Sequence, residues 1–203
     1  MTKPVCPFPG PRPLSEGHRL FSRDRIASAD ELINRITADR IVLLYSPSGA
    51  GKSSLLNAGL IPEMKHRGVA VRNTIRVNGA PDPASSRNEI RRGVNRYTLS
   101  CLDSLGIPVG APARLAQFLG HPDEDELLIF DQFEEILTAD PLDESGRREF
   151  FRQLGEALRI PAWYAVFAIR EDYLAMLQNY VIWLPGQLTS RMRLVNWPGS
   201  QMT

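Results

Sequence analysis

The chain has 203 residues, of which 43% are hydrophobic and 23% are charged, a globular composition that excludes a disordered or fibrous protein. Its 24 basic and 23 acidic residues nearly cancel, which argues against a protein that coats nucleic acid. The longest apolar run, at residues 162–169, has eight residues, far below the ~20 that a membrane-spanning helix needs.

The chain begins with a proline-rich segment, residues 1–19, that has no hydrophobic periodicity, so we expect an extended arm there. This segment lacks the apolar stretch of a secretory signal. The two cysteines, Cys6 and Cys101, belong to no metal-binding or redox motif and fit reduced thiols. We therefore expect a cytoplasmic protein without a membrane partner.

Apolar strands alternate with amphipathic helices along the remaining sequence. Two helix starts are marked by capping boxes, Ser28 to Glu31 and Ser86 to Glu89. In chain order we expect a helix from residue 28, a strand at 41–45, a helix at 52–60 ended by Pro62, a strand at 69–77, a helix at 86–105, a short helix at 115–119, a strand at 127–130, a helix at 144–159, a strand at 162–169, a helix at 171–178 and a strand at 191–197. This alternation predicts an α/β fold, with a mostly parallel five-stranded sheet between two layers of helices.

The segment 46–53, SPSGAGKS, lies between an expected strand and an expected helix. It matches the phosphate-loop pattern of glycine, four residues and Gly-Lys-Ser, except that Ser46 replaces the first glycine. In such a loop the backbone N–H groups surround a phosphate, Lys52 reaches its β and γ oxygens, and the Ser53 hydroxyl ligates Mg²⁺. The alternative is a glycine-rich turn without a ligand. We expect ATP or ADP to bind through Ser48, Gly49, Ala50, Gly51, Lys52, Ser53 and Ser54.

An acidic segment follows the expected strand at 127–130. Asp131 comes directly after four apolar residues, which predicts a carboxylate at the carboxyl edge of the sheet, where it would hold Mg²⁺ together with Ser53. Glu134 and Glu135 are candidates for the group that orients or deprotonates the attacking water. Alternatively, both only place negative charge in the first turn of a helix. The sequence does not choose between the two glutamates.

Arg170 ends the expected strand at 162–169. If this strand lies between those at 41–45 and 127–130, its end faces the γ-phosphate, and a guanidinium there would sense that phosphate. The alternative is an ion pair with Glu171 or Asp172. An arginine-rich stretch at residues 72–96 is interrupted by prolines and lacks interleaved aromatic residues, so we do not expect nucleic acid as a partner.

Five segments together resemble the "novel STAND" group of P-loop ATPases, relatives of the NACHT and apoptotic ATPase domains. They are PFPGPRPL at 7–14, LFSRD at 20–24, GAGKSSLL at 49–56, DQFEE at 131–135 and IREDY at 169–173, within a resemblance that covers about residues 7–197. The resemblance implies that Phe21 and Arg23 lie near the adenine, and that Glu134, Glu135 and Arg170 are catalytic. One departure is Ser22, where the family usually has glycine.

The resemblance also implies a switch in signalling or defence, in which ADP holds a resting state and ATP permits oligomerisation or other protein contacts. The sequence stops at Thr203, soon after the last expected strand, so we expect a truncated core without the family's helical lid and sensor repeats. Its parts would be an arm at 1–19, a core at 20–197 and a tail at 198–203. The expected activity is slow or partner-dependent, Mg²⁺-dependent ATP hydrolysis. Alternatives are a nucleotide-binding module without turnover and another P-loop enzyme, such as a small-molecule kinase.

Overall fold

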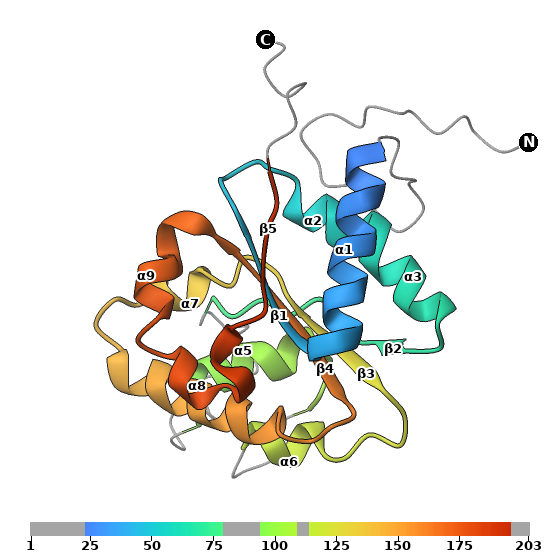
Figure 1. Ribbon diagram of the computed structural model, residues 1–203. Helices are drawn as coiled ribbons and strands as arrows, with labels where there is room; N and C mark the ends of the chain where they lie inside the picture. Colours follow the sequence, from blue (N-terminus) through green and yellow to red (C-terminus); the bar gives the residue numbers. More distant parts are fainter. Residues whose placement is uncertain (1–22, 79–93, 109–113, 196–203) are drawn as a thin grey trace, which may run out of the picture.

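The computed structural model describes residues 23–78, 94–108 and 114–195. Within these residues, parallel strands form a single five-stranded sheet in the order β2-β3-β4-β1-β5 (Figure 1). The strands are β1 (Ile41–Ser46), β2 (Ala70–Val71), β3 (Glu126–Phe130), β4 (Trp163–Arg170) and β5 (Arg191–Arg193). The predicted α/β class and parallel sheet are confirmed, and all the strands end at the same edge.

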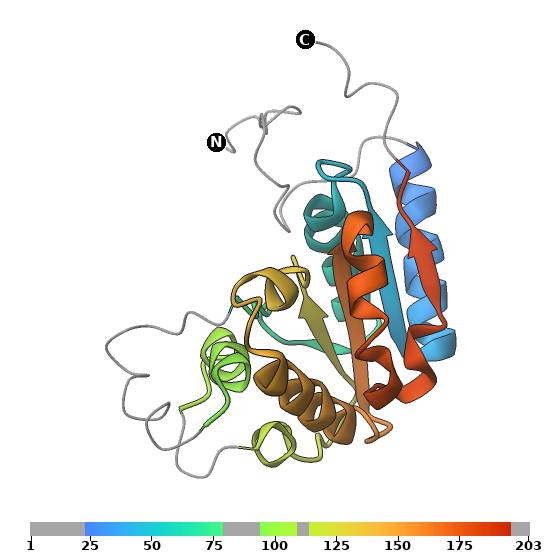
Figure 2. The same cartoon turned by 90° about the vertical axis from the view of Figure 1, so that its left-hand side faces the viewer.

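Helices cover both faces of the sheet, in the predicted three layers (Figures 1 and 2). One face packs against α1 (Arg23–Asp39), α2 (Lys52–Leu55), the π-helix η1 (Leu56–Leu60) and α3 (Ile61–His66). The other packs against α5 (Arg96–Ser104), α6 (Leu115–Leu119), α7 (Glu135–Thr138), α8 (Glu144–Ala157), α9 (Leu174–Leu177) and the 3₁₀ segments η2 (Glu171–Tyr173), η3 (Val181–Trp183) and η4 (Pro185–Leu188). Successive β1 residues alternate between the two cores, as strand geometry requires.

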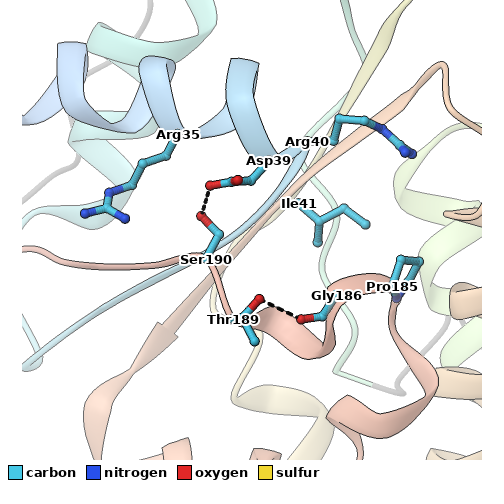
Figure 3. Close-up of a pocket in the computed structure, with 8 residues that line it drawn as sticks. All are labelled: Arg35, Asp39, Arg40, Ile41, Pro185, Gly186, Thr189 and Ser190. Atoms are coloured by element: carbon cyan, nitrogen blue, oxygen red, sulfur yellow. Dashed lines mark hydrogen bonds between the residues drawn. The ribbon is translucent and has the colours of Figure 1, made fainter.

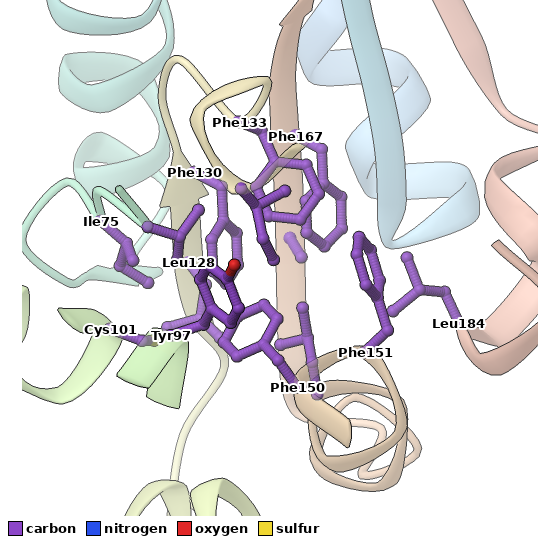
Figure 4. Packing of buried hydrophobic residues seen from close by; sticks show 14 of the residues in the cluster. Ile75, Tyr97, Cys101, Leu128, Phe130, Phe133, Phe150, Phe151, Phe167 and Leu184 are labelled. Atoms are coloured by element: carbon purple, nitrogen blue, oxygen red, sulfur yellow. The ribbon is translucent and has the colours of Figure 1, made fainter. Parts of the chain in front are cut away.

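Aromatic rings fill the core under the carboxyl half of β3 and β4 (Figure 4). Phe130 stacks on Phe167 with ring centroids 4.7 Å apart, and Phe133 lies 4.8 Å from Phe167 and 5.6 Å from Phe151. Phe133 is fully buried, and its backbone N–H donates to the carbonyl of Ala168 in β4. Because Phe133 follows Asp131 by two residues, its burial holds the acidic segment against the edge of the sheet.

The strand expected at 69–77 is interrupted. The N–H of Arg72 donates to the carbonyl of Leu127, but the next described bond to β3 runs from the N–H of Ile75 to Ile129. The edge segment therefore advances three residues while β3 advances two, which breaks the ladder as a bulge does. Of the strand expected at 69–77, the structure keeps only β2 (Ala70–Val71) and an isolated bridge between Ile75 and Phe130.

Two predicted helix limits near the phosphate loop are wrong. Helix α1 is already formed at Arg23, and the hydroxyl of Ser28 donates to the carbonyl of Asp24 within the helix instead of capping it. The helix at 52–60 does not end at Pro62. A π-helical segment changes the bonding pattern just ahead of this residue, which then lies in the first turn of α3, where a missing N–H costs little.

The predicted limits of two later helices also change. The expected cap at Ser86 lies outside the described residues, and the described helix α5 begins after Asn95, whose side chain accepts the N–H groups of Tyr97 and Thr98. The expected helix at 171–178 is divided into η2 and α9. The short helix α6 and strands β1, β3 and β4 match their predicted ranges closely.

Gly155 allows α8 to pack closely against η3. An alanine Cβ at this position would lie 2.0 Å from the backbone carbonyl oxygen of Trp183. We expect Gly155→Ala to lower the free energy of unfolding by about 1–3 kcal/mol, since one of the two backbones must move. Urea unfolding followed by circular dichroism measures this change. Arg148→Ala on the exposed face of α8 is the control, expected to cost within about 0.5 kcal/mol, and equal losses in both variants would contradict the packing argument.

Candidate functional site

The segment 46–53 connects the end of β1 to the start of α2, at the carboxyl edge of the sheet. Gly49 and Gly51 have φ values of 76° and 88°, a left-handed conformation that favours glycine. Ser46 instead belongs to β1, pairs in register with Arg170, and is fully buried. The serine in place of the first glycine is therefore accommodated, because this position continues the strand.

Lys52 begins α2 and its side chain folds back over the loop. Its Nζ donates to the Ser46 hydroxyl oxygen at 2.9 Å, so the residue that replaces the first glycine holds the lysine. Burial lowers the pKa of Lys52, and the nearby carboxylates of Glu134 and Asp131 partly oppose this shift. The ammonium group is thus held beside the Ser46 hydroxyl, where the negative charge of the acidic segment acts on it.

Ser53 and Asp131 contact each other at the carboxyl edge of the sheet. The Ser53 hydroxyl donates to Oδ2 of Asp131 at 2.7 Å, although 78 residues separate them in sequence. Asp131 is only 5% exposed, and its Oδ1 accepts the backbone N–H of Gln132. A hydroxyl and a carboxylate fit Mg²⁺, which takes oxygen ligands and usually keeps several waters and phosphate oxygens. Among the described residues there is no cluster of three or more His, Cys, Asp or Glu side chains that could hold a metal ion.

The two candidate glutamates have different partners. Oε2 of Glu134 accepts the backbone N–H of Arg170 at 3.3 Å, so it lies between the ends of β3 and β4. Oε1 of Glu135 lies 3.3 Å from a guanidinium nitrogen of Arg76, and its Oε2 is buried with no hydrogen-bond partner in the described structure. Burial raises the pKa of Glu135, while the charge of Arg76 opposes that rise.

Arg170 ends β4, which lies between β1 and β3 as a phosphate-sensing role requires. Its guanidinium pairs with Asp172 and lies 5.3 Å from the ring centroid of Tyr173. The ion pair that was the alternative role for Arg170 is therefore present. At the same time, β4 occupies the place in the sheet that the phosphate-sensing role requires. About 38% of the Arg170 side chain is exposed.

Two arginines that sequence reasoning missed also contact the site. Arg25 in α1 donates to the carbonyl of Ala50 at 2.7 Å and lies over Gly51, so α1 is attached to the phosphate loop. Arg76, from the segment after β2, contacts the acidic residues. Neither arginine belongs to a motif at the phosphate loop or the acidic segment, so no local sequence pattern indicated these contacts. Of the residues expected near adenine, Phe21 lies outside the described residues, and Arg23 is exposed at the start of α1.

A cavity of about 540 Å³ lies at the other end of the sheet (Figure 3). It is lined by Arg35, Asp39, Arg40, Ile41, Pro185, Gly186, Thr189 and Ser190. Ile41 is the first residue of β1, so the cavity is at the amino edge of the strands, away from Lys52. The Arg40 guanidinium donates to the carbonyls of Leu158, Ile160 and Trp163 and ties the surrounding loops together. Ligands of open parallel sheets bind at the opposite edge.

Over the part of the chain that the structure describes, no helix has the length and apolar character to cross a membrane.

Comparison with known proteins matches the chain to a family model and to solved structures. A family model described as "Novel STAND NTPase 1" matches residues 7–196. Among solved structures, the chain is similar to the Aeropyrum pernix ORC2 protein in its ADP form, with a TM-score of 0.52 and 16% identity. That likeness covers 89% of this chain and 50% of the ORC2 chain, so this chain spans about half its length; at this identity it shows the fold alone. No curated protein matches.

Proposed function

The chain belongs to the novel STAND NTPase family and has the fold of a P-loop NTPase core, and from this premise we propose that it is an Mg²⁺-dependent, ATP-binding switch. The nucleotide-binding core would occupy residues 20–197 of a cytoplasmic protein. ADP would hold the resting state, and ATP would permit contacts with protein partners or further copies of the chain.

The contact between Ser53 and Asp131 carries this proposal. It joins the helix start after the glycine-rich loop to an acid at the end of another buried strand. In a P-loop NTPase a hydroxyl and a carboxylate placed side by side hold the metal ion, and Ser53 and Asp131 would hold it here. A glycine-rich turn that binds no ligand would have no need of this contact between Ser53 and the buried carboxylate of Asp131, 78 residues away.

The surrounding residues have complementary roles. The left-handed glycines let backbone N–H groups face a phosphate, and Lys52 adds a positive charge beside them. When bound, Mg²⁺ would neutralise phosphate charge as a Lewis acid. Glu134 or Glu135 would accept a proton from the attacking water, and Arg170 would turn toward the γ-phosphate. These roles favour hydrolysis over transfer to an alcohol, because acids beside Asp131 suit water activation.

Titration of the purified chain with fluorescent ATP and ADP tests the proposal. We expect saturable binding of one nucleotide per chain, tighter with Mg²⁺ than with EDTA, because the Ser53 and Asp131 oxygens need the metal to reach the phosphates. Phosphate release under the same conditions measures turnover. Absence of binding at millimolar nucleotide would contradict the proposal. Binding without phosphate release would favour the module that lacks turnover.

A further inference from the structure

Arg76 places a positive charge against the acidic segment, opposite the phosphate loop. Its guanidinium lies 3.6 Å from Oδ2 of Asp131 and 3.3 Å from Oε1 of Glu135, and it also donates to the side chain of Gln132. Gln132 has a φ of 54°, an uncommon left-handed conformation for this residue type. A single arginine thus bridges three side chains of the segment 131–135.

The contact with Asp131 involves the same oxygen that faces the phosphate loop. Oδ2 accepts the Ser53 hydroxyl at 2.7 Å and lies 3.6 Å from the Arg76 guanidinium. A divalent cation that binds between the Ser53 and Asp131 oxygens would be repelled by a guanidinium this close to Oδ2. Metal binding and the Arg76–Asp131 ion pair therefore oppose each other.

The anchoring of Arg76 lets its side chain move while its backbone stays in place. Its N–H donates to the Ser104 hydroxyl at 3.2 Å, and its carbonyl accepts the hydroxyls of Ser100 and Ser104, all from α5. By contrast, its side chain is 42% exposed, so withdrawal into water has a small cost. The contact with Glu135 uses the other terminal nitrogen and does not depend on Asp131.

We propose that Arg76 is the resident counter-cation of Asp131, and that it sets the affinity of the site for a divalent metal by withdrawing when the metal and nucleotide bind. It would stay paired with Glu135. This inference rests on the proposed function, because it takes Asp131 and Ser53 as the metal-binding residues. Arg76 acts through these groups and is a positioning residue.

Mn²⁺ binding to the full chain, followed by electron paramagnetic resonance with ADP present, tests this inference. We expect Arg76→Gln to bind Mn²⁺ about fivefold more tightly than the wild type, because a repelling charge is removed. Arg76→Lys keeps the charge and should stay within about twofold of the wild type. Arg76→Met, which also removes the charge, is the second variant if the glutamine variant folds poorly, and the same gain in Mn²⁺ affinity is expected.

Arg72→Gln is the matched control. Arg72 lies four residues earlier on the same edge segment and is similarly exposed, but it pairs with Glu126 at the start of β3, far from Asp131 along the strand. The Arg72→Gln variant should leave Mn²⁺ affinity unchanged. Unchanged or weaker affinity in Arg76→Gln, or an equal gain in Arg72→Gln, overturns the inference and leaves the proposed function intact. If the wild type binds no Mn²⁺ with ADP, the proposed metal site and this inference both fail.

Discussion

Replacing Lys52 with alanine is expected to weaken MgATP binding by about a hundredfold or more. The lysine ammonium lies over the glycine-rich loop, 2.9 Å from the Ser46 hydroxyl, where it can reach a bound phosphate. Hydrogen bonds to charged groups contribute about 1.5–3 kcal/mol each, and a phosphate without its cation loses this contribution. Fluorescent-nucleotide titration of the wild type and the variant measures the change.

Lys65→Ala is the control for Lys52→Ala. Lys65 is exposed in α3, so its removal changes net charge equally without altering the loop. We expect it to bind MgATP within about twofold of the wild type, since screened surface charges contribute little. If Lys52→Ala keeps wild-type affinity, the nucleotide binds elsewhere and the phosphate-loop assignment is wrong.

The double variant Glu134→Gln, Glu135→Gln is expected to bind ATP normally and to lose hydrolysis. Both substitutions keep the side-chain length but remove the group that can accept a proton from water, and general-base catalysis contributes about 10²–10⁴-fold in rate. Single-turnover phosphate release measures the loss, and nucleotide titration confirms that binding is retained. Hydrolysis at the wild-type rate in the double variant would show that neither glutamate is the general base.

The two single variants then identify the base. Glu134→Gln keeps an oxygen that can accept the Arg170 N–H, so it tests the charge of Glu134 with little structural change. Glu135→Gln removes the ion pair with Arg76 as well as a carboxylate. The single variant that loses as much hydrolysis as the double variant identifies the glutamate that acts as the general base. Glu144→Gln, an exposed acid in α8, is the control and should keep full turnover.

Much of the fold could be predicted because buried parallel strands have a simple sequence pattern. β1, β3 and β4 are short, nearly continuous apolar runs, since helices cover both of their faces. Helix limits were harder, because the same local signals serve several structures. The capping box expected at Ser28 lies inside a helix, and Pro62 follows a π-helical segment instead of ending the helix. Serine and proline are each compatible with more than one place in a helix, so neither residue type sets a helix limit by itself.

The sequence by itself determined the local chemistry of the candidate site. Eight consecutive residues specify a glycine-rich turn with a lysine and a serine, and an apolar run places Asp131 at a strand end. Only the tertiary structure decided which of these groups meet. The order β3-β4-β1 brings Asp131 to Ser53, and the edge segment after β2 carries Arg76 to Asp131. Such contacts depend on strand order and register, which arise from packing between residues far apart in the chain and leave no local pattern.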